Sequence, residues 1–274
     1  MTAQTDKFPG VRDFFATHPV FTHAEFVEAH TSGGRSQNTS NNLLSKQVAA
    51  GRLVRVKRGI YATVPYGVDP KKFQPDPYLV ATHSRDDAVV ALHSAMSFHG
   101  KAYSVWWRMQ YLTAARVRPF TFRGVEYAGI QAPRPVRELP EFGGGVQLRP
   151  HAGVKVRVTS LERTLVDLLH TPEQGGGWEE IWRSLESVEF FKLDMVIKYA
   201  YLLGSSLTIA RVGFFLDQHR EELMVGDVHL DALARHVPSQ PSYLDRRREQ
   251  GRLVHPWNLI VPEKVLHRRW EEPL

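Results

Sequence analysis

The chain has 274 residues, of which 42% are hydrophobic and 23% are charged, and this globular composition excludes a largely disordered chain. It contains no cysteine, which excludes a disulfide framework, a cysteine-ligated zinc site and a thiol nucleophile. The formal net charge of +6 favours a polyanionic partner, although many enzymes are equally basic.

The start of the chain and its apolar stretches predict a soluble, cytoplasmic protein with no membrane partner. The first ten residues lack the basic and then apolar pattern of a signal peptide. Apolar stretches are interrupted by charged residues or glycine well short of the about 18 residues that a membrane-spanning helix needs.

The first 64 residues predict three helices followed by a β-hairpin. Thr22 and Glu25 have the spacing of a capping box, which marks the start of the second helix, and Gly51 is a stop signal for the third. Alternating apolar residues on both sides of a Gly59 turn indicate a hairpin. The predicted helices cover residues 11–16, 22–29 and 36–50, and the predicted strands cover 53–57 and 60–64.

Four prolines, at positions 65, 70, 75 and 77, follow this hairpin and predict a domain boundary, since proline continues neither a helix nor a central strand. We therefore expect an α+β protein. Residues 1–70 would form a winged helix-turn-helix, and residues 71–274 a larger mixed α/β domain with a helical C-terminal part.

The rest of the chain predicts alternating helices and strands. The helices are expected over residues 77–83, 88–99, 161–170, 178–188, 193–203 and 207–219, and the strands over 110–114, 120–123, 125–130 and 154–158. A long loop is expected over 133–150, because this segment is rich in glycine and proline. Thr159 and Glu162 have the spacing of a second capping box. Beyond it, we expect Glu162, Arg163 and Asp167 to pair along the exposed side of the helix.

Charge in the N-terminal part predicts binding to nucleic acid. Between Ala29 and Val68 there is no aspartate or glutamate, and six cations fall in the same stretch. These cations are Arg35, Lys46, Arg52, Arg55, Lys57 and Arg58.

The third helix is the candidate for reading DNA. Its apolar residues fall on one side of a helical wheel and its polar residues on the other, and asparagine can bond both N6 and N7 of adenine in the major groove. The hairpin turn would touch backbone phosphate or the minor groove. The predicted DNA-binding residues are Arg35, Asn38, Thr39, Asn41, Asn42, Ser45, Lys46, Lys57 and Arg58. Two alternatives stay open: the polar face is merely solvated, or the winged fold binds protein.

A search for catalytic motifs predicts no enzyme, no catalytic residue, no metal site and no cofactor. His93 and His99 are six residues apart, and the sequence lacks His-Glu-x-x-His, Gly-x-Ser-x-Gly and Walker motifs. Residues 175–177 are three glycines that we interpret as a break between helices. Gly204 and Ser205 resemble the start of a nucleotidyltransferase site, but only Asp217 follows at a useful distance, and such a site needs paired carboxylates.

Four short segments, in order, resemble AbiEi-family antitoxins. Residues 158–167 (VTSLERTLVD) are similar to the central segment of that family, and residues 58–61 (RGIY) to its wing. Residues 210–216 (ARVGFFL) and 257–262 (WNLIVP) are similar to its later helix and closing strand. The resemblance extends from about residue 8 to residue 265.

The resemblance implies an antitoxin of a type IV toxin–antitoxin pair, a class associated with phage defence. The winged helix would bind its own operator in double-stranded DNA and repress the operon. The second domain would counteract, directly or indirectly, a nucleotidyltransferase-like toxin, through partner-binding residues that stay unknown. One alternative is a stand-alone transcriptional regulator whose second domain senses a ligand. Another is an enzyme hidden in that domain.

A second basic stretch lies between Ala114 and Val158, where eight cations occur with three anions. It could extend the DNA footprint, meet an acidic toxin surface, or consist of scattered solvated arginines.

Overall fold

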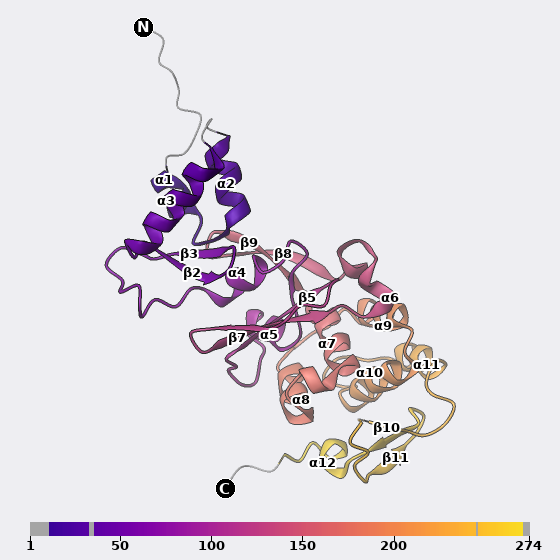
Figure 1. The fold of residues 1–274 in the computed structure, drawn as a ribbon. Coiled ribbons are helices and arrows are strands. Elements are labelled where there is room, and N and C mark those ends of the chain that lie inside the picture. The colour runs from indigo at the N-terminus through magenta and orange to yellow at the C-terminus, as the bar shows by residue number, and fades with distance from the viewer. Residues whose placement is uncertain (1–10, 33–35, 245, 271–274) are drawn as a thin grey trace.

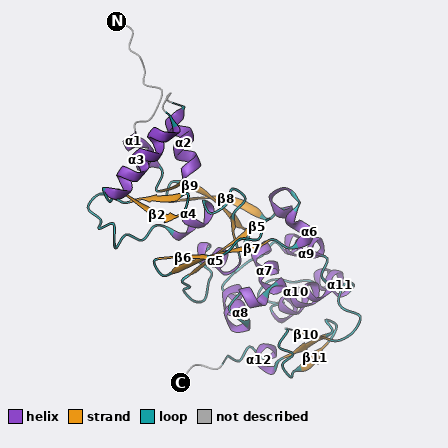
Figure 2. Cartoon of the chain, viewed as in Figure 1, coloured by secondary structure: helices purple, strands orange, loops and turns teal. Residues whose placement is uncertain are grey.

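The computed structural model describes residues 11–32, 36–244 and 246–270. The molecule is elongated (Figure 1): the N-terminal helices lie at one end, a sheet occupies the middle, and the C-terminal helices and a small sheet lie at the other end. Helices and strands are mixed along the chain (Figure 2), so the expected α+β class is confirmed.

The N-terminal unit contains three helices and three short strands in its described part. Thr22 accepts a hydrogen bond from the backbone N–H of Glu25 and Glu25 bonds back to Thr22, which confirms the capping box. The strand β1 was not predicted; it pairs antiparallel with β3 and gives the sheet order β1-β3-β2. The elements are α1 (Val11–Thr17), β1 (Val20–Thr22), α2 (His23–Thr31), α3 (Gln37–Ala49), β2 (Leu53–Lys57) and β3 (Ile60–Thr63).

The middle of the molecule is a sheet with the strand order β6-β7-β5-β4-β9-β8 within the described residues. The pairs β5–β7 and β4–β9 are parallel, and the other pairs are antiparallel. The strands are β4 (Val89–Val90), β5 (Arg108–Thr113), β6 (Phe120–Phe122), β7 (Val125–Gln131), β8 (Val146–His151) and β9 (Val154–Thr159). Two helices accompany them, α4 (Pro77–Thr82) and α5 (Leu92–Phe98).

Three local predictions in this region were wrong. Val89 and Val90 form strand β4 and not the start of a helix, because each pairs with β5. The expected loop over 133–150 contains α6 (Arg134–Arg137), a 3-10 turn η1 (Pro140–Gly143) and most of β8. The cap of the following helix is Ser160, whose hydroxyl accepts from the N–H of Arg163, and not Thr159.

The C-terminal part is helical and ends in a small sheet of order β10-β12-β11. Helix α7 packs against α5, α9 and α10 and thereby connects the central sheet to the helical layer. The helices are α7 (Leu161–His170), η2 (Pro172–Gln174), α8 (Trp178–Glu186), α9 (Leu193–Leu203), α10 (Ser206–Gln218), α11 (Asp227–Ala234) and α12 (Glu263–Leu266). The strands are β10 (Ser242–Tyr243), β11 (Arg252–Val254) and β12 (Leu259–Val261).

The two faces of the central sheet are covered by different parts of the chain. Successive side chains of a strand point to opposite faces. Val90 belongs to the same buried cluster as Val54 of β2 and Leu79 of α4, whereas Val89 belongs to the cluster that contains α7 and Trp182 of α8. The N-terminal strands therefore share a core with the central sheet across the predicted boundary at residue 70, a boundary that stays a prediction.

Helix α7 carries a buried ion pair where the sequence predicted an exposed one. Arg163 and Asp167 pair as expected, with 3.2 Å between Nε and Oδ2, but only 1% and 3% of their side chains are exposed. Arg163 also donates from Nη1 to the carbonyl oxygens of Phe142 and Gly144, at 3.1 and 2.6 Å. The expectation of an exposed pair was wrong because the loop before β8 folds over this side of the helix.

Candidate nucleic-acid interface

Helix α3 presents one polar face to solvent. Its N-terminus is capped by the hydroxyl of Ser36, which accepts from the N–H of Thr39 at 3.3 Å. On the inner side, Leu44 is 2% exposed and packs in a cluster with Phe26 of α2. Buried Ser40 lies 2.7 Å from His30 Nδ1, so the hydroxyl that faces the core has a partner on α2. These contacts fix which side of α3 faces the core and which side faces solvent.

The predicted DNA-binding residues of α3 all lie on its exposed side. They are Asn38, Thr39, Asn41, Asn42, Ser45 and Lys46. The side chains of Asn38 and Asn42 make no hydrogen bond to any other described residue, whereas Ser45 donates to the carbonyl of Asn41 at 3.0 Å. Arg35 lies outside the described residues. Base contacts by this face stay a prediction.

A hydrogen-bonded bridge holds the β2–β3 turn beside the middle of α3. His23 Nε2 lies 2.6 Å from Asn41 Oδ1 on α3. The backbone N–H of the same His23 donates to the carbonyl of Gly59 in the turn at 2.7 Å. The polar face of α3 and the turn are therefore parts of one surface. His23 was not predicted as part of this surface, and its only signal in the sequence is its position directly after the Thr22 cap.

The two basic residues at the end of the hairpin differ in their surroundings. Arg58 is exposed in the turn itself. Lys57 is half-buried, and its ammonium lies 4.6 Å from the ring centre of Phe120 on β6. Lys57 thus contacts the central sheet, and Arg58 is the better-placed cation for a phosphate outside the protein. Their contacts with phosphate stay a prediction.

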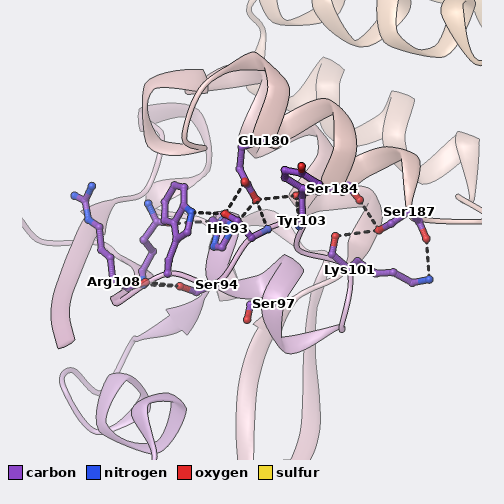
Figure 3. A network of polar contacts seen from close by, with 12 residues as sticks. His93, Ser94, Ser97, Lys101, Tyr103, Arg108, Glu180, Ser184 and Ser187 are labelled. Atoms are coloured by element: carbon purple, nitrogen blue, oxygen red, sulfur yellow. Dashed lines mark hydrogen bonds and ion pairs between the residues drawn. The ribbon is translucent and has the colours of Figure 1, made fainter. Parts of the chain in front are cut away.

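A second polar cluster lies between α5 and α8 (Figure 3), and its geometry is that of a structural network. Glu180 Oε1 is 3.0 Å from His93 Nε2, and Ser104 donates to Glu180 Oε2 at 2.6 Å. Ser184 donates to the same carboxylate, and the His93 ring stacks on Trp106 with 3.8 Å between ring centres.

The carboxylate of Glu180 is held ionised by this network. Burial raises its pKa, but hydrogen bonds from His93 and Ser104 outweigh the burial and hold the pKa at about 2. Ser104 bonds to the carboxylate and not to the imidazole, so the cluster lacks the serine–histidine contact of a nucleophilic site. In the part of the chain that the structure describes, no group of three or more His, Asp or Glu side chains is placed to hold a metal ion.

The chain is of the mixed α/β class, with a small helical unit and a three-stranded sheet joined to a larger sheet with helices. No family model and no curated protein matches its sequence. Among solved structures, it is similar to the RV2827C protein from Mycobacterium tuberculosis, with a TM-score of 0.58 and 18% identity over 90% of this chain and 87% of that chain. At this identity, the likeness shows the fold alone. None of the described helices is both long and apolar enough to cross a bilayer.

Proposed function

We propose that the N-terminal unit is a winged helix-turn-helix that binds double-stranded DNA. In this proposal α3 enters the major groove, and the β2–β3 turn is the wing. The observation that carries it is the single surface formed by the exposed asparagines of α3 and the exposed Arg58, joined through His23. No acidic residue occurs between Ala29 and Val68, so no acidic side chain of this segment repels the phosphates of DNA.

The two parts of this surface have different roles. Asn38 and Asn42 would read base edges, because a carboxamide can donate and accept at adenine. Lys46 and Arg58 would bind phosphate, which positions the protein and gives no preference for sequence. Asn41 already bonds to His23 and so would orient the turn and not read a base.

We predict that Asn42→Ala and Arg58→Ala weaken DNA binding in different ways. Asn42→Ala should lower affinity for the operator by about 1–3 kcal/mol and leave binding to a scrambled duplex unchanged. Arg58→Ala should weaken both alike and reduce the slope of log affinity against log salt by about 0.9. The measurement is a titration of the full chain with both duplexes at several salt concentrations.

The control for this titration is Lys198→Ala, which removes an exposed cation from α9, far from α3 (Figure 1). It should leave both affinities unchanged. If Lys198→Ala weakened binding as much as Arg58→Ala does, attraction by the overall charge would explain the binding. If Asn42→Ala had no effect on either duplex, the reading face would not be this side of α3.

We further propose that the chain is the antitoxin of a type IV toxin–antitoxin pair. It would repress its own operon in the cytoplasm through the N-terminal unit and counteract a nucleotidyltransferase-like toxin through the rest of the chain. The resemblance to AbiEi-family antitoxins supports this proposal. The alternative is a stand-alone regulator in which the second part senses a ligand.

Neutralisation can be tested apart from repression. The toxin that this proposal implies is expressed from an unrelated promoter, and the full chain with Asn42→Ala and Arg58→Ala is supplied separately. We expect growth to be restored, because the variant retains the C-terminal part and lacks only the reading residues. If this variant is folded, fails to bind the operator and also fails to restore growth, the stand-alone regulator becomes the better explanation.

A further inference from the structure

A large cleft is lined by residues of α7, α8, α10, β10 and α12 and of the segments next to them. Figure 1 shows these elements at the end of the molecule opposite α3. The cleft has a volume of about 1720 Å³, and its walls come from three separate parts of the chain. These are the segment from α7 to the start of α8, the start of α10, and the segment from β10 to α12 together with the residues that follow it. Small-molecule pockets usually have volumes of about 300–1,000 Å³, so this cleft suits a longer ligand.

One arginine is built into the lining of the cleft. Arg211 of α10 is only 5% exposed. Its Nε donates to the carbonyl of Leu244 at 2.7 Å, and its Nη1 donates to the carbonyl of Leu169 at 2.9 Å. The guanidinium carbon lies 5.8 Å from the ring centre of Trp178. These contacts hold the side chain of Arg211 in place in the wall of the cleft.

The rim of the cleft is rich in cations that lack acidic partners. Arg246, Arg248 and Arg269 are exposed, and none of them forms an ion pair with an acidic side chain among the residues described. Among the acids that line the cleft, Glu249 pairs with Lys264 at 3.0 Å and Glu263 with His267 at 2.9 Å, whereas Glu173 is exposed. Six arginine and lysine side chains stand against four glutamates among the described lining residues, and this excess of cations favours anions.

Aromatic rings lie among these cations. Tyr243 of β10 is 38% exposed and lines the cleft, and half-buried Trp270 lines it after α12. Proteins bind single-stranded nucleic acid by combining a basic groove for the phosphates with aromatic rings on which bases stack. We propose that this cleft binds a short single-stranded segment of nucleic acid. The site is separate from α3, so the inference does not depend on the proposed recognition of duplex DNA.

The proposal is tested with labelled single-stranded RNA and DNA of about ten nucleotides, a length in the range that one such groove covers. Fluorescence anisotropy of the full chain with each oligonucleotide gives the affinity. We expect Arg246→Ala with Arg248→Ala to weaken binding about tenfold or more. Tyr243→Leu should also weaken it, by several-fold, through loss of stacking. Thermal unfolding of each variant should match that of the unmodified chain, because all three side chains are exposed.

The matched control is Arg55→Ala with Arg58→Ala, which removes two exposed cations from the N-terminal unit. This pair should weaken single-stranded binding less than the Arg246 and Arg248 pair does. A larger loss from the control pair than from the Arg246 and Arg248 pair would overturn the proposal and assign the binding to the N-terminal surface. Absence of binding at low salt would also overturn it. Competition by a nucleoside triphosphate or by polyglutamate as effective as that by unlabelled oligonucleotide would assign the cleft to a mononucleotide or to an acidic peptide.

Discussion

Replacing Arg163 with alanine is expected to lower the free energy of unfolding by about 3–5 kcal/mol, because this is the usual cost of removing one partner of a buried ion pair. Arg163 is 1% exposed, and its removal leaves Asp167 with an uncompensated buried charge. The carbonyls of Phe142 and Gly144 would lose their donor as well. Tyr199 still donates to Asp167 Oδ1 at 2.9 Å, but a neutral donor does not replace the cation. Urea unfolding followed by circular dichroism measures the change.

The matched control is Arg183→Ala on helix α8. Arg183 forms an ion pair of the same spacing with Glu179, at 2.9 Å, but the two side chains are 32% and 41% exposed. Such a surface pair contributes about 0–1 kcal/mol. If the two variants lost similar amounts of unfolding free energy, burial would not make the Arg163 ion pair more stabilising than a surface pair.

Gly213→Ala is expected to destabilise the C-terminal part by about 3 kcal/mol, at the upper end of the usual cost of overpacking a core. A Cβ atom at Gly213 would lie 2.0 Å from Cζ3 of Trp257. The indole cannot easily move away, because it is fully buried and its Nε1 donates to Asp217 at 3.0 Å. The thermal unfolding midpoint should fall accordingly.

A double-mutant cycle separates this clash from a change in helix propensity, which would by itself favour alanine. Trp257→Leu alone opens a cavity, and alanine at 213 should partly fill it. The double variant is therefore expected to lose less unfolding free energy than the two single variants lose together. Strict additivity would mean that the contact between Gly213 and Trp257 does not limit the packing.

The local signals in the sequence located most of the elements correctly. The Thr22–Glu25 capping box and the Gly59 turn are set by residues a few positions apart, and both are present. The polar face of α3 was predicted because helical periodicity alone separates Leu44 from Asn42.

Features that depend on distant contacts were missed. Val89 and Val90 have no local mark that distinguishes a strand from a helix, and partners in β5 decide the outcome. The burial of Arg163 depends on the loop before β8, about 20 residues earlier in the chain. The link from Asn41 through His23 to the turn joins three separate elements. Two of the segments that carry the family resemblance meet at Gly213 and Trp257, and nothing in either segment indicates that contact.

The shared core of the hairpin and the central sheet has a consequence for synthesis on the ribosome. Val54 and Ile60 of the hairpin are buried in one cluster with Val156 and Val158 of β9. At about 5–20 residues per second, the ribosome makes β9 roughly 5–20 seconds after the hairpin. During that interval the apolar side of the hairpin lacks its final cover, and the parallel pairing of β4 with β9 cannot form. The hairpin therefore leaves the ribosome well before its cover is made, and chaperones would meet it in that state.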